Sequence, residues 1–327
     1  MEFFAVGHQN DDQKITTNGN KTNLTVVTEF LLLGFQGSQH LRYLLFLLFF
    51  VIFGTTICGN ILIITLVSTS KNLQSPMYFF ISQLSINDIL LPTNIVPKIL
   101  HILLKNGGTI SFIACMTQLY FFCAAEIVEC LLLTLMSYDR YMAICNPLRY
   151  TTIMTNAFCV KSVTMCWFLG IIVSFILTIT PSKLFYCGPN IIDHLFCDLL
   201  PLLELACSDT FIFHLEIYLI GFPIVFIPTA LIVVSYICIV LEILRIPSST
   251  GRQKAFSTCS SHLIVVSIFY GTLFSVYFIP RTGQTWDVNK HLSLLYTVFT
   301  PLINPIVYSL RNKDIKKAVK NISFNKP

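Results

Sequence analysis

Apolar residues fill seven stretches of the chain, and short polar segments separate them. Each stretch is long enough for a helix of roughly 20 residues to cross a lipid bilayer. Prolines interrupt several stretches, which a helix bundle tolerates because neighbouring helices satisfy the freed carbonyl groups. The pattern predicts an all-α fold, a bundle of seven transmembrane helices. The predicted spans are 41–67, 76–103, 110–138, 157–180, 211–241, 255–279 and 291–310.

The basic residues predict how this bundle lies in the membrane. If the N-terminus is outside, most of the 21 Lys and Arg residues face the cytoplasm, as the positive-inside rule requires. The chain then divides into an extracellular tail (1–40), the bundle (41–310) and a cytoplasmic tail (311–327) that begins with an amphipathic helix. The net charge of +5 is concentrated in this last segment, so it indicates a membrane-surface tail and not a nucleic-acid site.

Composition supports an integral membrane protein, and its expected location is the plasma membrane. Hydrophobic residues make up 54% of the chain and charged residues 11%, about half the usual charged share of soluble domains. The first 40 residues lack a cleavable signal pattern, so the first span is expected to direct insertion. Asn20 in "NKT" and Asn23 in "NLT" are glycosylation acceptors on the predicted outer side, and the sequence does not choose between them.

Cysteine usage divides by position. Four of the 12 cysteines lie at or beyond the outer ends of the predicted helices, where the compartment is oxidising. Four cysteines allow three pairings, and spacing alone selects none of them. The other eight are expected to pack as small apolar residues. The four outer cysteines are Cys115, Cys187, Cys197 and Cys207.

The third span ends in "MSYDRYMAICNPLRY", where an adjacent acid and base, Asp139 and Arg140, lie at the inner membrane boundary. This stretch resembles the signature of the olfactory receptors, a branch of the rhodopsin-like G-protein-coupled receptors. Other segments resemble the same family in the same order: "VTEFLLLGF", "PMYFFISQLSINDIL", "KAFSTCSSHL" and "PLINPIVYSLRN". The form "KAFSTCSSHL" is typical of the tetrapod-type, class II branch. The resemblance covers residues 23–320.

The resemblance implies a function and its partners. An odorant receptor binds a small volatile ligand inside the bundle, moves its sixth helix outward and activates a stimulatory olfactory-type G protein, which raises cAMP. It also implies a set of activation and coupling residues, with the acid and arginine of the Asp-Arg-Tyr motif paired at rest. A plain surface ion pair is the alternative for that motif. The implied set is Asp139, Arg140, Tyr141, Tyr236, Asn304, Pro305 and Tyr308.

Four polar residues lie on separate predicted helices in the apolar region: Asn60, Asp88, Glu129 and Asn304. Alone, each would cost several kcal/mol in hydrocarbon, so we expect them to satisfy one another. In related receptors the positions of Asp88 and Asn304 hold sodium or ordered water. Two alternatives stay open: a bound sodium ion, or a protonated hydrogen-bond network that needs no cofactor.

The family's disulfides imply the pairs Cys115–Cys197 and Cys187–Cys207, which would hold the second outer loop as a lid over the bundle. His194, Cys197 and Asp198 form an HxxCD pattern that also occurs in metal sites. A disulfide at Cys197 would remove its thiolate, so the pattern predicts no metal site.

The resemblance places the ligand in the outer third of the bundle, where mostly apolar side chains are expected to surround it. The alternative for each of these residues is packing between helices or against lipid. Tyr270 occupies the position of an aromatic that is coupled to activation. The expected ligand-binding residues are Phe122, Cys123, Glu126, Ile127, Ile220, Gly221, Ile224, Tyr270, Leu273, Phe274, Tyr277, Leu294 and Thr297, and helical spacing adds Cys130.

Two acids in "CAAEIVEC" have different expected roles. Glu126 and Glu129 are three residues apart, about 4.5 Å along a helix, so one lies about a turn nearer the outside. Two such carboxylates in a low dielectric resist double ionisation. Glu129 is expected in the polar network. For Glu126 the hypothesis is a ligand anchor that pairs with an amine or accepts a hydrogen bond from an alcohol, and the alternative is an interhelical hydrogen bond.

Other classes of membrane protein are less consistent with the sequence. A transporter or channel, the second hypothesis, would show inverted repeats of broken helices, and no internal repeat is visible. A retinal pigment needs a lysine in the middle of the seventh span, but residues 292–310 contain none. An enzyme is not indicated, because no nucleophile-base-acid set appears. Ligand-dependent cAMP would separate the receptor from these classes.

Overall fold

A computed structural model describes residues 27–187, 189–278, 286–311 and 314–318. The glycosylation acceptors Asn20 and Asn23 lie outside this part of the chain. The long helices are α1 (Gln39–Thr69), α2 (Pro76–Lys105), α3 (Phe112–Cys145), α5 (Asn156–Lys183), α8 (Phe222–Arg245) and α9 (Ser249–Phe278). The shorter elements are α4 (Pro147–Ile153), α6 (Leu199–Leu205), α7 (Phe211–Glu216), α10 (Trp286–Leu294), α11 (Thr300–Arg311), η1 (Lys71–Leu73), β1 (Glu29–Leu32), β2 (Gly108–Ser111) and β3 (Ile191–Ile192).

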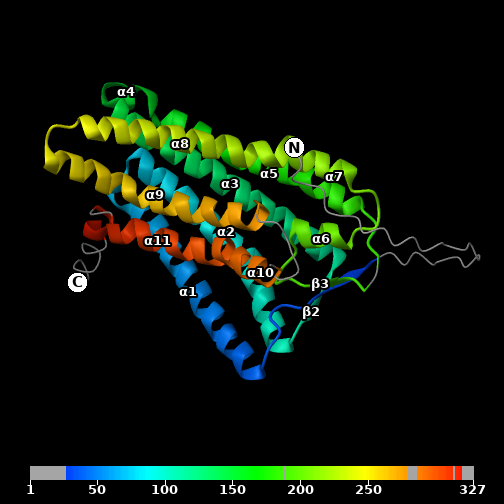
Figure 1. Cartoon of the computed structure of the whole chain (residues 1–327). Coiled ribbons are helices and arrows are strands. Elements are labelled where there is room, and N and C mark those ends of the chain that lie inside the picture. The colour runs from blue at the N-terminus through cyan, green and yellow to red at the C-terminus, as the bar shows by residue number, and fades with distance from the viewer. Residues whose placement is uncertain (1–26, 188, 279–285, 312–313, 319–327) are drawn as a thin grey trace, which may run out of the picture.

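These elements form the predicted seven-helix bundle. Within the described residues, six helical segments are long and apolar enough to span a membrane, and α2, with 30 residues, is the further helix. The chain is therefore a multi-pass membrane protein. Its two ends differ in structure: β2, β3 and α6 lie at one end, which we call the lid end, and α4 lies at the other, which we call the tail end (Figure 1).

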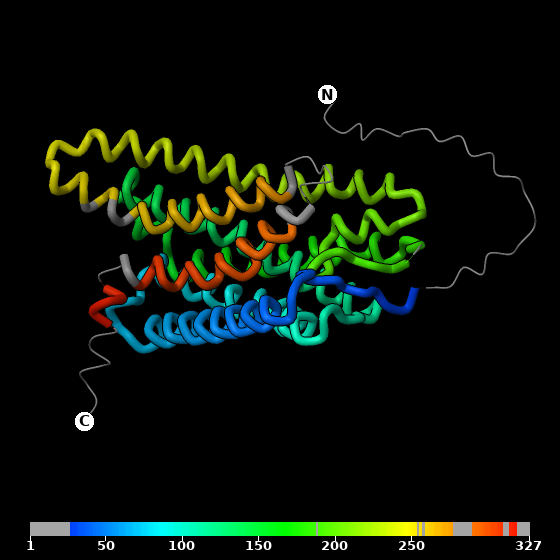
Figure 2. Tube along the Cα trace, turned by 60° about the horizontal axis from the view of Figure 1, so that its bottom comes forward, coloured from blue at the N-terminus to red at the C-terminus, as the bar shows by residue number. Residues whose placement is uncertain are grey.

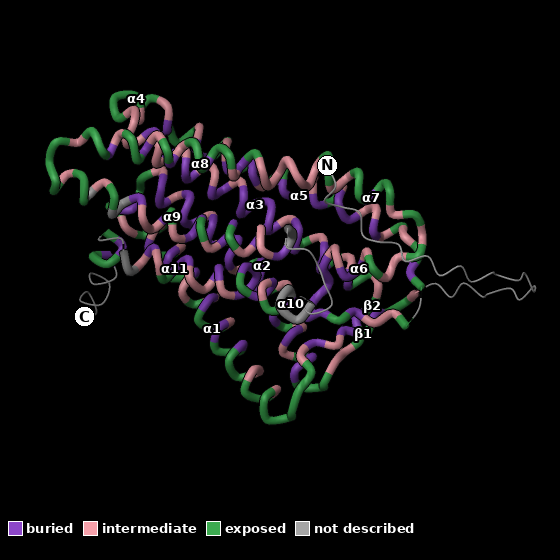
Figure 3. Tube along the Cα trace, in the orientation of Figure 1, coloured by how far each residue is buried: buried purple, intermediate pink, exposed green. Residues whose placement is uncertain are grey.

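Helix α3 forms the centre of the bundle. It contacts α2, α5 and α8, and buried positions continue along most of its length (Figure 3). Its first residues are fixed by Ser111, whose hydroxyl accepts a hydrogen bond from the backbone N–H of Ala114 at 3.3 Å. Asp139 near the tail end and Glu129 in the middle are both fully buried. Chemistry-bearing residues of this helix thus face other helices and not lipid.

Two spans contain a widened, π-helical turn that the apolar pattern does not reveal. The turn η2 (Ile217–Gly221) joins α7 to α8, and η3 (Leu295–Phe299) joins α10 to α11. Each turn ends two residues before a proline, Pro223 or Pro301. Proline has no N–H to donate to the carbonyl one turn back, so the helix loses a regular bond there and adopts the wider turn.

A small sheet closes the lid end, which the sequence did not predict. β1 is its central strand, antiparallel to β2 and parallel to β3, which belongs to the loop between α5 and α7. Figure 2 shows the blue segment at the start of the described chain running beside the green part of this loop. The side chains of Phe30 and Leu32 are fully buried. The predicted third span was wrong at its start, because Ile110 pairs with Phe30 in this sheet and the helix begins at Phe112.

The chain leaves the sheet through Gly34, which has a φ of +67°. We expect Gly34→Ala to destabilise the fold by about 1–3 kcal/mol, because a side chain resists this conformation. The added Cβ would also collide with Cγ2 of Ile102. The measurement is the thermal unfolding of detergent-solubilised protein, together with its level at the cell surface.

Gly54→Ala is the matched control. An added Cβ at Gly54 has nothing within 4 Å, and the residue lies within α1, where alanine favours the helix by about 1 kcal/mol. If Gly34→Ala unfolded at the same temperature as the unmodified receptor and Gly54→Ala, the role given to this turn would be contradicted.

Candidate ligand site and activation switch

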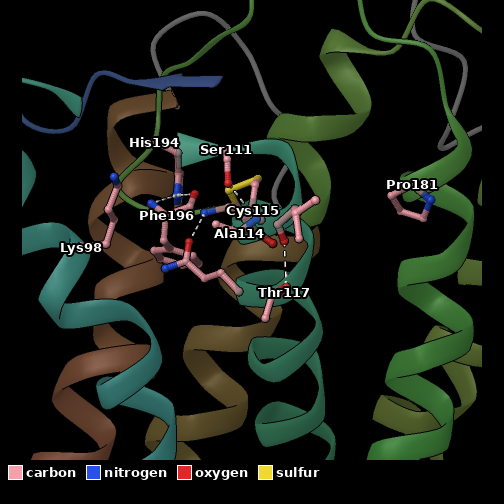
Figure 4. The surroundings of a disulfide bond; sticks show 12 residues. Lys98, Ser111, Ala114, Cys115, Thr117, Pro181, His194 and Phe196 are labelled. Atoms are coloured by element: carbon pink, nitrogen blue, oxygen red, sulfur yellow. Dashed lines mark hydrogen bonds between the residues drawn. A yellow bond between two sulfur atoms is a disulfide. The ribbon is translucent and has the colours of Figure 1, made fainter. Parts of the chain in front are cut away.

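The loop between α5 and α7, residues 184–210, is tied down over the bundle and is called the lid below. Disulfides join Cys115 to Cys197 and Cys187 to Cys207, the pairs that the family resemblance implied. The first attaches the lid to the start of α3, and Figure 4 shows it beside Phe196 and His194. Cys197 also donates its backbone N–H to Oε1 of Gln118 at 3.0 Å. The lid is therefore fixed to α3 by a covalent bond and a hydrogen bond.

The HxxCD pattern has structural uses in the lid. Nε2 of His194 lies 3.2 Å from Oγ of Ser293 in α10, and Nδ1 lies 3.1 Å from the Phe196 carbonyl. Cys197 is in the disulfide, and Asp198 accepts a hydrogen bond from the N–H of Leu199 at 2.7 Å, at the start of α6. This use of the histidine, as a bridge from the lid to the seventh helix, was not predicted.

Lys290 makes a second bridge at the lid end. Its Nζ donates to Oδ1 of Asp193 in the lid at 2.5 Å and to the Gly34 carbonyl at 3.3 Å. The lysine is 5% exposed, so the ion pair is partly protected from solvent. The segment after β1, the lid and the seventh helix are therefore held at one point.

The expected ligand residues of α3 lie beneath the lid. The ring of Phe122 is 5.3 Å from that of Phe196 in the lid and 6.2 Å from that of Tyr296 in η3. Cys123, Ile127 and Cys130 are buried as well. Phe196 and Tyr296 were missed by the sequence analysis: Phe196 is a variable position of the HxxCD pattern, and Tyr296 belongs to no quoted motif.

The expected residues of the other helices fall into three groups. Ile220, Gly221 and Ile224 lie at η2 and the start of α8 and are half-buried. Tyr270 and Leu273 of α9 are buried, as are Leu294 and Thr297 of the seventh helix. Phe274 packs against Phe226 with ring centroids 5.5 Å apart. The side chain of Tyr277 lies outside the described residues.

Tyr270 links α9 to α3. Its hydroxyl donates to the Cys130 carbonyl at 3.4 Å, and its ring packs against Phe269 and Phe274. The tyrosine therefore connects α9, the helix that is expected to move, to α3, the helix that carries Glu126 and Glu129.

Glu126 and Glu129 are both buried, at 9% and 0% exposure. Among the described residues, none of their four carboxylate oxygens accepts a hydrogen bond of regular geometry, although the Asn304 amide lies beside Glu129. A buried carboxyl group without a partner costs free energy, so each acid is expected to meet a ligand, a cation, water or its own proton.

The expected mutual bonding of the four polar residues was only partly right. Asn304 donates to both oxygens of Asp88, at 3.0 and 3.2 Å. Asn60 does not join them, because its amide donates to the carbonyls of Pro301 and Thr56. The physical reason is Pro305, which lacks an N–H and so leaves the Pro301 carbonyl without its usual helical donor.

Within the described residues, several oxygen atoms of this polar group remain without a hydrogen bond. The oxygens of Glu129 and Oδ1 of Asn304 have no hydrogen-bond partner in the described structure, and the Asp88 carboxylate binds Asn304. Carboxylate and amide oxygens are ligands for hard cations. The described residues contain no group of three or more His, Cys, Asp or Glu side chains placed to hold a metal ion. A bound sodium ion and a protonated hydrogen-bond network therefore both stay as the two expectations for this group.

Asp139 and Arg140 form an ion pair at the tail end. Nε and the terminal NH2 of Arg140 donate to Oδ2 of Asp139 at 3.1 and 2.7 Å. Tyr150 of α4 donates to Oδ1 at 2.8 Å. Burial and the neighbouring Asp139 carboxylate raise the pKa of Tyr150, so this hydroxyl stays protonated as the donor. The aspartate is fully buried, which distinguishes the pair from an ordinary surface ion pair.

A second contact at this end was missed from the sequence. The Tyr236 hydroxyl lies 2.5 Å from Nδ1 of His262, which joins α8 to α9. His262 is the histidine of "KAFSTCSSHL", so the quoted motif contained it. Tyr308 is buried on α11, and the ring of Tyr141 stacks on that of Tyr138 at 6.5 Å. The helices that would separate on activation are thus joined through side chains.

Comparison with known proteins agrees with this arrangement. Residues 46–326 match the olfactory receptor family. Human olfactory receptor 11L1 is 46% identical over 304 residues, which cover 93% of this chain and 94% of the relative. Human olfactory receptor 10A7 is 46% identical over 298 residues, covering 91% and 94%. Rat olfactory receptor 1500 is 43% identical over 304 residues, covering 93% and 97%.

These matches extend over nearly the whole length of each protein, and the seven-helix fold agrees with them. Receptors of this kind are not enzymes. The chain belongs to the olfactory receptor family and is an odorant receptor.

Proposed function

We propose that this receptor binds a small volatile ligand beneath the lid and activates a stimulatory olfactory-type G protein, raising cAMP. The observation that carries the proposal is the link through Tyr270, which bonds to the Cys130 carbonyl on the same helix as the expected ligand residues. A ligand that displaces Tyr270 weakens this contact between α9 and α3. The tail end of α9 then moves away from α3 and opens a surface for the G protein.

The proposal includes the orientation of the receptor in the plasma membrane, with the N-terminus outside. The two disulfides lie at the lid end, which suits an oxidising compartment. At the tail end, Arg140, Arg149, Arg245 and Arg252 lie in or beside the loops between helices. This distribution follows the positive-inside rule.

The bond between Tyr236 and His262 supports a closed starting state. It joins α8 to α9 near Arg140, in the region where a G protein would insert. Opening the tail end breaks this bond and the pair between Arg140 and Asp139, and the freed arginine and tyrosine can then reorganise around the G protein.

We expect a volatile agonist to raise cAMP only in cells that contain a stimulatory α subunit. The receptor is expressed with trafficking factors in cells from which that subunit has been deleted, and a cAMP reporter is read with and without the restored subunit. An agonist that raises cAMP in cells with the subunit is expected to give no cAMP response in cells without it. A cAMP response that survives the deletion would refute this coupling.

A further inference from the structure

Glu126 is a buried acid for which the described part of the chain offers no partner. It is 9% exposed, and neither Oε1 nor Oε2 has a hydrogen-bond donor there. The alternative role for this residue, an interhelical hydrogen bond, is therefore not made by any described side chain or backbone group. A carboxyl group buried to this extent in a protein almost always has a partner.

The position of Glu126 is fixed by its neighbours on the same face of α3. Phe122 is one turn nearer the lid and touches Phe196 and Tyr296. Cys130 is one turn nearer the tail end, and its carbonyl accepts from Tyr270 of α9. Positions four apart lie on one helix face. The carboxyl group therefore faces the bundle interior, below the lid and above Tyr270.

The surroundings of Glu126 are acidic. Glu129, Asp198 of the lid and Asp88 all repel negative charge on Glu126. Two cationic side chains of the lid end are bonded elsewhere: Lys98 donates to the Thr109 carbonyl at 2.6 Å, and Lys290 pairs with Asp193. Arg140 pairs with Asp139 at the tail end. The described charged groups that act on Glu126 are thus all acids.

We propose that the ligand of this receptor is a small apolar primary amine, bound as its ammonium ion to the carboxylate of Glu126; this inference rests on the proposed function. An ammonium group brings a positive charge and three N–H donors, whereas an alcohol brings one donor and no charge. Alkylamines, like the lysine side chain with a pKa of about 10, are protonated at neutral pH. Phe122, Ile127 and Leu294 supply apolar surface for the carbon chain.

The test compares amines with matched neutral compounds on receptor-expressing cells. Butylamine, hexylamine, cyclohexylamine and phenethylamine are applied beside the alcohol and acetate ester of the same carbon skeleton, and cAMP is recorded with surface staining. We expect one or more amines to be agonists. Glu126→Gln keeps the size of the side chain and removes its charge, and is expected to lower amine potency about 10- to 100-fold.

Two further variants separate charge from folding. Glu126→Asp keeps the charge on a shorter side chain, so it is expected to lose less amine potency than Glu126→Gln. Glu216→Gln is the matched control: this acid accepts a hydrogen bond from Thr180 at 2.6 Å, where α7 meets α5, and its exchange is expected to leave amine potency unchanged. Potencies are compared at equal surface staining.

The outcomes distinguish the two proposals. Alcohols or esters that raise cAMP while every amine fails would overturn the amine inference and leave the proposed function standing. Amine potency that is equal in Glu126→Gln and the unmodified receptor would overturn it as well. A receptor that reaches the surface and raises cAMP with no probe would count against the proposed function itself.

Discussion

Cys115→Ser is expected to remove the receptor from the cell surface. The bond from Cys115 to Cys197 joins residues 82 apart in sequence, and losing a native disulfide of this span costs about 3–5 kcal/mol. Both cysteines are fully buried, so the substitution also leaves a hydroxyl group and the free thiol of Cys197 in apolar surroundings. The stability of a folded domain is only about 5–15 kcal/mol, so a loss of this size leaves much of the chain misfolded. Flow cytometry of a tagged receptor measures the surface fraction.

Cys58→Ser is the control for this experiment, because Cys58 is free and exposed on α1. Its surface level is expected to match that of the unmodified receptor. Cys187→Ser opens the bond whose partners are 20 residues apart, so its expected cost is smaller, about 3 kcal/mol. If Cys115→Ser reached the surface in normal amount and kept its ligand response, the lid would not depend on this bond.

Much of the bundle was predictable because each membrane-spanning helix appears in the sequence as a long run of apolar residues. The seven spans follow from the requirement that a helix buries its backbone bonds in lipid. The strand β1 has no comparable sequence pattern. "EFLL" is only four residues long, and its partners come from two distant segments, β2 and β3. Strand pairing over such distances depends on tertiary contacts, which the pattern of one short segment does not contain.

Part of the candidate site was likewise predictable from the sequence, and part was not. The disulfide pairs were implied by the family's known bridges, and the Asp139–Arg140 pair by a motif that contains both residues. The partners of polar side chains were harder to foresee. Asn60 bonds to the Pro301 carbonyl only because Pro305 leaves that carbonyl free, and His194 bonds to Ser293 only because the lid reaches α10. Such bonds depend on where two elements meet, and a linear sequence does not give that position.

Arg140→Ala is expected to abolish the cAMP response to any agonist of the receptor. In the closed state the guanidinium is held by two hydrogen bonds to Oδ2 of Asp139, while Tyr150 occupies Oδ1. The proposed opening frees the arginine to face the G protein, a contact that alanine does not make. The substitution also leaves the Asp139 carboxylate buried without its charge partner, at a cost of about 3–5 kcal/mol. The cAMP response must therefore be compared at equal surface level.

Two companion variants make this comparison decisive. Arg140→Lys keeps the positive charge but loses the planar fork that holds one carboxylate with two donors, so a reduced response is expected where alanine gives none. Arg149→Ala removes an exposed arginine of α4 on the same side of the membrane and is expected to respond normally. If Arg140→Ala signalled with full amplitude at normal surface level, the ion pair would only stabilise the fold. A loss shared by Arg140→Ala and Arg149→Ala would instead point to the total charge of the tail end, because charge on an exposed face acts through the sum of its residues and not through one geometry.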